Sequence, residues 1–347
     1  MLPQFVPAAR PLPGSRRTRA GAARYHAGPI TVKNPVPSRE SQPAIELSAV
    51  IVGIAADEPQ VLVVPPATGA LEALPSGPLE SAHRTLEAGL RSWVERQTGQ
   101  MLGYVEQLYT FGDRNRTRQG RTLSIGYLAL VRELKPARHA GAAWRSAYRY
   151  FPWEDWRAGR PPALAQIDSQ LRRWIADAAS AAERRLREER VRATFALGGR
   201  PWNEERVLER YELLYEARLV AEAWRDARQT PPAASALLPG APMGSDHRRI
   251  LATGLGRLRS KLKYRPVLFD LTPGLFTLSE LQAAAEAVSG LTLHKQNFRR
   301  GVERTGLVEP TGQLSSTTGG RPAELFRFKG VDPQTGAAPG LSLPAQR

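Results

Sequence analysis

The sequence has no cysteine among its 347 residues. This absence excludes disulfide bonds, a thiolate nucleophile and every zinc site built on cysteine, including the zinc fingers that read DNA. Long hydrophobic runs are also missing. Because no stretch of about 18 uncharged apolar residues occurs, no segment is predicted to span a bilayer, and we expect a cytoplasmic protein.

Acidic residues are scarce compared with basic ones, most of all towards the two ends of the chain. There are 49 Lys and Arg residues against 33 Asp and Glu residues, which gives a formal net charge of +16. Residues 1–44 carry +6 and residues 246–330 carry +7, so that only +3 falls on residues 45–245. This surplus predicts a polyanionic partner: nucleic acid, an acidic membrane or a phosphorylated ligand.

The order of the predicted elements indicates an α+β fold. Strand-like segments alternate with one helix in residues 45–160, a pattern typical of an α/β/α sandwich. Two long helices follow, and "ALGGRPWNEE" turns them into a central helical hairpin. The predicted parts are a disordered basic tail or targeting peptide (1–44), a ligand-sensing domain (45–160), the hairpin (161–228), a Pro/Ala-rich linker (229–245), a helix-rich C-terminal domain (246–330) and a disordered tail (331–347).

The stretch "GPLESAHRTLEAGLRSWVERQTGQ", residues 77–100, is predicted to form an amphipathic helix closed by a glycine. Its spacing resembles the Nudix box, whose glutamates hold the magnesium that activates water on a diphosphate. Two positions match the box, Arg91 and Glu95. Three positions that need glutamate hold His83, Ser92 and Arg96. Since one carboxylate beside an arginine does not hold magnesium, we expect no metal, no catalytic residue and no hydrolysis.

Three other interpretations of this helix remain open. It can be an ordinary surface helix whose spacing is a coincidence. His83 can form a small metal site with Glu80 and Glu87, which lie on the same helical face. The enzymatic alternative is a Nudix-type hydrolase of ADP-ribose or a related nucleoside diphosphate with relocated acids, drawn from Glu80, Glu87, Glu95 and Glu106.

Basic and aromatic side chains suited to a nucleotide follow this helix. The arginines of "FGDRNRTRQGRT" can neutralise a diphosphate without metal, because guanidinium groups bind phosphate oxygens in pairs. The indoles of "YRYFPWEDWR" can stack on an adenine, or can instead pack the hairpin onto the sheet. The predicted ligand-binding residues are Arg114, Arg116, Arg118, Arg121, Trp153 and Trp156.

A helix-turn-helix is predicted in "FTLSELQAAAEAVSGLTLHKQNFRRGVERTGLVEPTG". Thr277 and Glu280 have the spacing of a capping box that starts the first helix. In the second helix Phe298 and Val302 form the inward face, and Gly306 ends it. A Gly-rich hairpin then forms the wing of a winged helix.

The second of these helices is predicted to enter a DNA major groove. At about 100° per residue from Phe298, Gln296, Arg299 and Arg300 point away from the core. The basic stretch 247–263 just before this unit also favours DNA, although small helix-turn-helix units can serve as protein-interaction modules. The predicted DNA-binding residues are Thr277, Lys295, Gln296, Arg299, Arg300, Arg304 and Arg321.

Several segments together resemble Nudix-related transcriptional regulators of NAD metabolism of the NrtR type, and most closely the longer NadQ-like branch. They are "YVEQLYTFGDRNRTRQGRTLSIGYLALV", "FPWEDW", "NFRRGVERTGLVE" and "GGRPAELFRFKG". The resemblance implies a degenerate Nudix-like sensor domain joined to a winged helix. It also implies a homodimeric repressor of NAD biosynthesis or salvage genes, which binds double-stranded operator DNA and no membrane.

The same resemblance implies that the sensor domain binds NAD, ADP-ribose or a related adenine nucleotide as an effector, without any cofactor. Corepression by NAD and derepression by ADP-ribose are both consistent with this hypothesis. A scaffold that binds proteins through the central hairpin is the third alternative, beside the repressor and the hydrolase.

Overall fold

The computed structural model describes most of the chain between the two ends: residues 43–65, 71–112, 121–135, 141–231, 237–315 and 322–330. The two predicted tails lie outside the described residues, apart from Pro43 and Ala44. Within the described residues, no helix is both long enough and apolar enough to cross a membrane.

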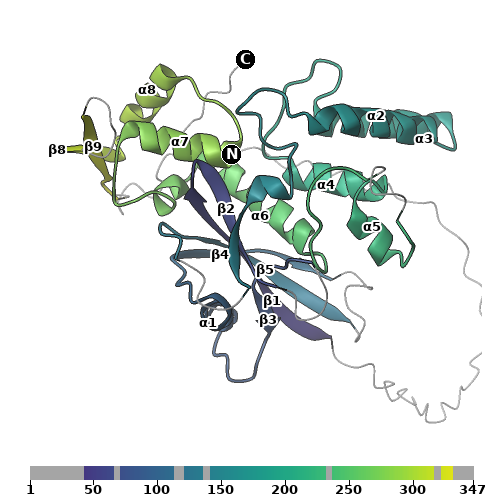
Figure 1. Cartoon of the computed structure of the whole chain (residues 1–347), viewed down its shortest axis with the longest axis horizontal. Helices are drawn as coiled ribbons and strands as arrows, with labels where there is room; N and C mark the ends of the chain where they lie inside the picture. The colour runs from purple at the N-terminus through teal and green to yellow at the C-terminus, as the bar shows by residue number, and fades with distance from the viewer. Residues whose placement is uncertain are drawn as a thin grey trace, which may run out of the picture. The chain divides into compact units, whose positions relative to one another are not determined.

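A mixed sheet forms the centre of the N-terminal half (Figure 1). Its strand order is β4-β5-β1-β2-β6, and β3 pairs with β1. β1 and β5 are parallel, whereas the other pairs are antiparallel. The strands are β1 (Ala44–Ala55), β2 (Glu58–Val63), β3 (Ser76–Pro78), β4 (Tyr104–Phe111), β5 (Thr122–Leu130) and β6 (Ala143–Ser146).

One helix covers each face of the sheet. On one face, α1 (Leu86–Thr98) packs Leu90 and Val94 against β1. On the other face lies α6 (His247–Leu262), where Gly254 permits close approach: a Cβ there would lie 2.8 Å from a methyl carbon of Val50. The predicted α/β/α sandwich is therefore confirmed, and its second helix comes from the basic stretch near the C-terminus.

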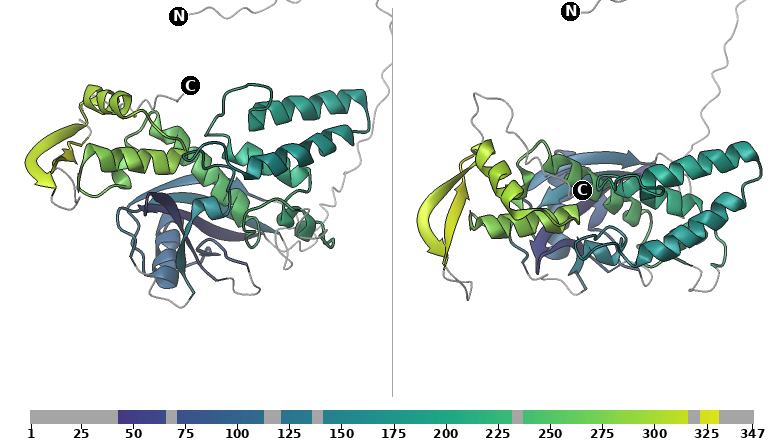
Figure 2. Two further views of the ribbon diagram at one scale, coloured as in Figure 1. Left: turned by 45° about the horizontal axis from the view of Figure 1, so that its top comes forward. Right: turned by 90° about the horizontal axis from the view of Figure 1, so that it is seen from above.

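The helical region differs from the prediction. The first predicted helix is broken in two, because Ser180 caps a new helix by accepting a hydrogen bond from the backbone N–H of Glu183. The second is interrupted where Arg218 adopts a left-handed backbone (φ 56°). α2 and α3 therefore form an antiparallel pair of their own (Figure 2). The helices are α2 (Ala163–Ala176), α3 (Ala181–Phe195), α4 (Val207–Glu216) and α5 (Ala221–Asp226).

Much of the predicted linker is packed against neighbouring elements in residues 237–245, whereas residues 229–231 are exposed. In residues 237–245, Met243 is fully buried, and the backbone N–H of Leu238 donates to the carbonyl of Leu219 (2.9 Å). The backbone N–H of Gly244 donates to the carbonyl of Glu72 (2.9 Å). Residues 237–245 therefore do not form a free linker between two domains, because neighbouring elements bury Met243 and bond to the backbone of Leu238 and Gly244.

The C-terminal unit is the predicted winged helix. Two helices, α7 and α8, lie in the chain between the first strand and the other two strands of a three-stranded sheet of order β7-β9-β8. Its hydrophobic core is continuous with that of the sheet: buried Leu281 and Phe298 belong to the same cluster as Val50 of β1. The elements are η3 (Val267–Asp270), β7 (Leu275–Phe276), α7 (Leu278–Ser289), α8 (Lys295–Thr305), β8 (Val308–Ser315) and β9 (Ala323–Phe328).

A buried carboxylate joins the helices to one another. Glu154, in the segment after η1 (Ala147–Arg149), has a fully buried side chain. One carboxylate oxygen accepts from Nε of Arg210 in α4 (2.6 Å), and the other accepts from Arg259 in α6 (2.6 Å). We call Glu154, Arg210 and Arg259 the central triad. Because water does not reach these charges, each depends on the others for its neutralisation.

The central triad also holds the winged helix in place. Arg259 donates from Nε to the carbonyl of Val288 in α7 (2.9 Å), and the backbone N–H of Trp156 donates to the carbonyl of Gly290 (2.7 Å). Gly290 has φ 72°, and a Cβ there would lie 2.3 Å from the carbonyl oxygen of Glu154. A glycine is therefore required where α7 ends against the triad.

Replacing Glu154 with glutamine should strongly destabilise the fold. The amide would leave two buried guanidinium groups without a counter-charge, so we expect the free energy of unfolding to fall by about 3–5 kcal/mol. Urea denaturation measures this change. The matched control is Glu216→Gln, which removes the exposed partner of Arg190 and should cost about 0.2–1 kcal/mol. Equal losses in the two variants would show that the triad has no special role.

Candidate nucleic-acid interface and effector pockets

The first helix of the winged unit begins as the sequence predicts. The Thr277 side chain accepts from the backbone N–H of Glu280 (3.2 Å), and the Glu280 carboxylate accepts from the backbone N–H of Thr277 (2.7 Å). The predicted capping box is confirmed. Leu281 and Val288 face the core, also as predicted.

The second helix, α8, turns a polar face outward. Phe298 and Val302 are buried, and Gly306 ends the helix with a left-handed φ of 63°. On the opposite side, Gln296 and Arg300 are exposed. Three further exposed charged residues of the helix are Lys295, Glu303 and Arg304.

Three of the predicted DNA-binding residues are not exposed residues of this kind: one is buried, one is half-buried and one is not described by the structure. Thr277 is 4% exposed and its side chain serves as the helix cap, so it does not fit a direct DNA contact. Arg299 is half-buried, and its buried Nε has no hydrogen-bond partner among the residues that the structure describes. Arg321, at the tip of the predicted wing, lies outside the described residues.

The basic helix α6 does not add to the DNA interface as the sequence suggests. Most of its cations are turned into the protein, where they meet carboxylates far away in the chain. Lys261 contacts Glu106 at 2.7 Å, and Arg248 contacts Glu222 at 3.3 Å. Its paired cations are Arg248, Arg249, Arg259, Lys261 and Lys263. The basic stretch 247–263 therefore gives less support to DNA binding than its charge suggests, because five of its cations are paired with carboxylates and Arg257 is the one left exposed without an ion pair among the described residues.

The Nudix-like helix α1 keeps its arginine for structural reasons. Arg91 donates to the carbonyls of Leu102 (2.6 Å) and Gly103 (3.1 Å) in the loop that leads to β4. It also contacts Glu87 at 2.9 Å. Arg91 therefore ties the helix to the next strand while it neutralises one carboxylate.

His83, which occupies the first glutamate position of the box, is held by contacts with the nearby Glu80. His83 Nδ1 accepts from the backbone N–H of Glu80 (3.1 Å), and its Nε2 lies 3.4 Å from the Glu80 carboxylate. That carboxylate also contacts Arg96 (3.4 Å), whose guanidinium lies over the Trp93 ring. The proposed metal site of His83, Glu80 and Glu87 is not formed, because Glu87 pairs with Arg91 instead.

The relocated acids of the hydrolase alternative are equally occupied. Glu106 accepts from the Tyr104 hydroxyl (2.6 Å) and contacts Lys261. Of the four carboxylates considered, Glu95 alone is exposed without an ion pair among the described residues. Groups of three or more acidic, histidine or cysteine residues arranged for a metal do not occur in the described part. These carboxylates do not fit a magnesium ion, which requires several oxygen ligands.

The six predicted nucleotide-binding residues differ in exposure, and three of them lie outside the described residues. Arg121 is exposed at the start of β5, whereas Arg114, Arg116 and Arg118 lie outside the described residues. Trp153 is 0% exposed and its ring lies beneath the Arg248 guanidinium.

The expectation that Trp153 stacks on an adenine is therefore wrong, because the helical bundle covers the ring. Trp156 is half-buried and packs on Trp202 at a centroid distance of 4.7 Å.

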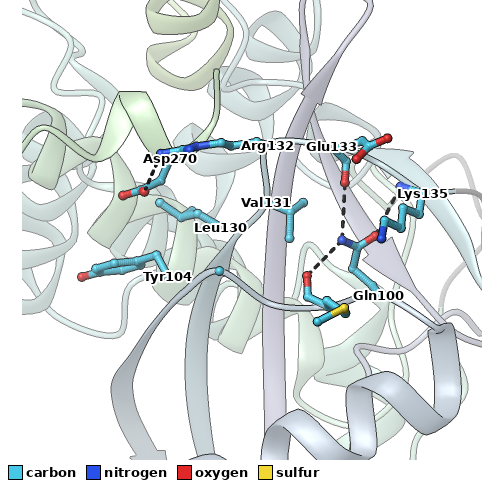
Figure 3. A pocket seen from close by; sticks show the side chains of 10 residues that line it. Gln100, Tyr104, Leu130, Val131, Arg132, Glu133, Lys135 and Asp270 are labelled. Atoms are coloured by element: carbon cyan, nitrogen blue, oxygen red, sulfur yellow. Dashed lines mark hydrogen bonds and ion pairs between the residues drawn. The ribbon is translucent and has the colours of Figure 1, made fainter. Parts of the chain in front are cut away.

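One cavity lies where the sheet meets the winged helix (Figure 3). It has a volume of about 440 Å³ and lies between the loop after α1, the end of β5 and η3. Arg132 donates from Nε to the carbonyl of Phe269 (3.0 Å) and lies 3.7 Å from Asp270. Burial raises the pKa of Asp270, and Arg132 partly opposes this shift. The lining has two cations (Arg132 and Lys135) and two carboxylates (Glu133 and Asp270), so it does not select for an anion.

A larger cavity of about 580 Å³ lies between the end of β4, α4 and α6. Sequence reasoning missed it, because its three walls come from distant segments. Arg249, Thr253 and Arg257 line it from α6 at a spacing of four residues, the one signal that sequence could have provided. Both cavities combine aromatic, aliphatic and basic groups, but the lining of the larger one has two arginines against a single carboxylate, Glu212.

Comparison with known proteins identifies the C-terminal unit. Residues 268–328 match the family model of the NrtR DNA-binding winged helix domain. Over 83 residues the chain is 43% identical to a protein of Acinetobacter baylyi named ADPR responsive transcriptional repressor NtrR. That match covers 24% of this chain and 33% of the relative, so the chain matches about a third of the relative's length.

Solved structures show the same fold over most of the chain. Shewanella oneidensis NrtR superposes with a TM-score of 0.53 at 20% identity, covering 86% of this chain and 99% of that one. The same protein complexed with a 27mer DNA gives a TM-score of 0.50 at 20% identity, covering 82% and 93%. The chain thus joins an NrtR-type winged helix to the α+β fold of NrtR, which confirms the resemblance to Nudix-related regulators of NAD metabolism.

Proposed function

We propose that this protein is a ligand-responsive transcriptional repressor that reads double-stranded operator DNA through α8. The observation that carries the proposal is the outward face of that helix. Gln296 and Arg300 stand opposite the buried Phe298 and Val302, within a unit that matches NrtR DNA-binding domains. Glutamine and arginine are the residue types that bond to adenine and guanine edges in the major groove.

The proposed targets are genes of NAD biosynthesis or salvage, and the proposed effector is ADP-ribose, NAD or a related adenine nucleotide. The name of the Acinetobacter baylyi relative, an ADPR responsive transcriptional repressor, supports ADP-ribose first. A homodimer fits this function, because two winged helices can contact two half-sites about one DNA turn apart.

The proposed division of labour follows the predicted boundaries. Residues 45–160 sense the effector and residues 246–330 bind DNA, while the helices of residues 161–228 and the segment 229–245 hold the two together. The contacts of the central triad support this arrangement, because they link α4, α6 and the end of α7.

The sensor domain is proposed to bind its nucleotide without hydrolysing it. Support comes from three of the four candidate carboxylates, which contact cationic or histidine side chains in place of a metal: Glu80 contacts His83 and Arg96, Glu87 contacts Arg91, and Glu106 contacts Lys261. A regulator that cleaved its effector would erase its own signal, so loss of the metal ligands and retention of the fold are consistent with sensing.

Substitutions in α8 should separate base reading from simple charge attraction. A duplex is first enriched by the wild-type protein from a random-sequence library, and binding is then measured on it and on a scrambled duplex. Gln296→Ala and Arg300→Ala should each cost about 1–3 kcal/mol on the enriched duplex and much less on the scrambled one. Glu303→Gln, which removes a negative charge from the same face, should strengthen binding to both.

The control for these variants is Arg192→Ala, an exposed arginine of α3 paired with Glu188. It should leave both affinities unchanged. If Arg300→Ala lowers the affinity for both duplexes equally, Arg300 contacts only phosphate and reads no base. Failure of the wild-type protein to enrich any duplex would contradict the repressor function itself.

Magnesium should not stabilise the wild-type protein. A ligand that binds only the folded state raises the midpoint of thermal unfolding, and the paired carboxylates of α1 give the ion no site. The matched variant carries His83→Glu, Ser92→Glu and Arg96→Glu together, which restores the three missing carboxylates. We expect millimolar Mg²⁺ to raise the midpoint of this variant alone, and a rise in the wild-type protein would revive the hydrolase alternative.

A further inference from the structure

The larger cavity has the size and construction of a small-molecule site. Its volume of about 580 Å³ lies in the range of ligand pockets, about 300–1,000 Å³. Three elements enclose it: the end of β4 from Leu108 to Gly112, α4 through Leu208 and Glu212, and α6. Because these elements belong to both the sheet and the helical region, an occupant would contact both.

The β4 side of the cavity offers an aromatic and aliphatic surface. Tyr109 is 65% exposed, which is unusual for a ring on a strand, and it meets Phe111 edge to face at a centroid distance of 5.6 Å. Leu108 and Leu208 add aliphatic surface. A planar ring system is the ligand group that such a surface favours.

The α6 side supplies positive charge. Arg249 and Glu212 form an ion pair, so their charges offset each other within the lining. Arg257 is exposed and has no ion-pair or side-chain hydrogen-bond partner among the described residues, which leaves the lining with one uncompensated cation. A guanidinium group binds phosphate oxygens in pairs. The cavity therefore combines a ring-binding wall with a phosphate-binding cation.

We propose that the effector, an adenine nucleotide with a diphosphate, binds in this cavity between β4, α4 and α6, with its ring against Tyr109 and a phosphate on Arg257. This inference rests on the proposed function, assigns its sensing step to residues outside the Nudix-like helix, and extends the sensing region beyond residues 45–160 to α4 and α6. The smaller cavity beside η3 is the poorer candidate, because its carboxylates are as many as its cations.

The position on α6 explains how occupancy reaches the DNA-binding unit. Arg257 faces the cavity, whereas Arg259 is rotated about 200° around the helix axis and bonds to Glu154 and to the carbonyl of Val288. One helix thus presents one side to the ligand and the other to the winged helix. A ligand that draws Arg257 towards β4 would shift α6, and with it the contact between Arg259 and the carbonyl of Val288 in α7.

Calorimetric titration of the full-length protein with ADP-ribose tests the assignment. Arg257→Ala removes a charge-assisted phosphate contact and should raise the dissociation constant about tenfold or more. Tyr109→Ala removes the stacking surface and should raise it at least about fivefold. The matched control is Arg265→Ala, an exposed arginine just beyond α6 and outside the cavity, which should stay within about twofold of the wild-type value.

Three measurements make the outcome decisive. Circular dichroism and thermal midpoints establish that each variant is folded, which is expected because Tyr109 and Arg257 are both exposed. The shift in DNA affinity caused by ADP-ribose should be lost together with binding. Binding of ADP-ribose that ignores both substitutions overturns the cavity and leaves the proposed function intact. A wild-type protein that enriches a duplex yet binds no ADP-ribose overturns the effector and the cavity together, while DNA reading stands.

Discussion

The fold depends on one buried carboxylate shared by two arginines. Glu154 holds Arg210 of α4 and Arg259 of α6, and no water competes for these charges. Removing three charges from water is costly, and only short, well-directed contacts in all directions compensate for that cost. Here the spare donors of Arg259 reach the carbonyls of Val288 and Glu204. These hydrogen bonds, together with the continuous hydrophobic core, fix α4, α6 and the end of α7 relative to one another.

Helix α6 carries out several tasks that would occupy separate elements in a simpler protein. It covers one face of the sheet, supplies Arg248 and Arg259 to two buried ion pairs, and lines the larger cavity. Gly254 lets it lie directly on β1. Because one rigid helix joins these surfaces, a small displacement at any of them is felt at the others.

The winged helix could be predicted from sequence because each of its signals is local. The capping box, the buried Phe298 and Val302, and the final glycine all lie within a few residues of the structure they determine. The break at Ser180 was also readable, since Ser180 and Glu183 have capping-box spacing.

The role of the α6 cations could not be predicted in the same way. The sequence shows only that the helix is basic, because the partner of Arg259, Glu154, lies 105 residues earlier in the chain. The cavity was missed for the same reason, because β4, α4 and α6 meet only in the folded protein.

The continuous hydrophobic core has an evolutionary consequence. A DNA-binding domain and a sensor domain can be exchanged between genes when a flexible linker joins them, because each domain then folds alone. Here the apolar core runs from β1 into α7 and α8, and Gly290 fits against the backbone of Glu154. A transplanted DNA-binding domain would expose that surface and separate Arg259 from Glu154. We therefore expect the DNA-binding domain and the sensor domain of this protein to be inherited as one unit, with their contacting residues changing together.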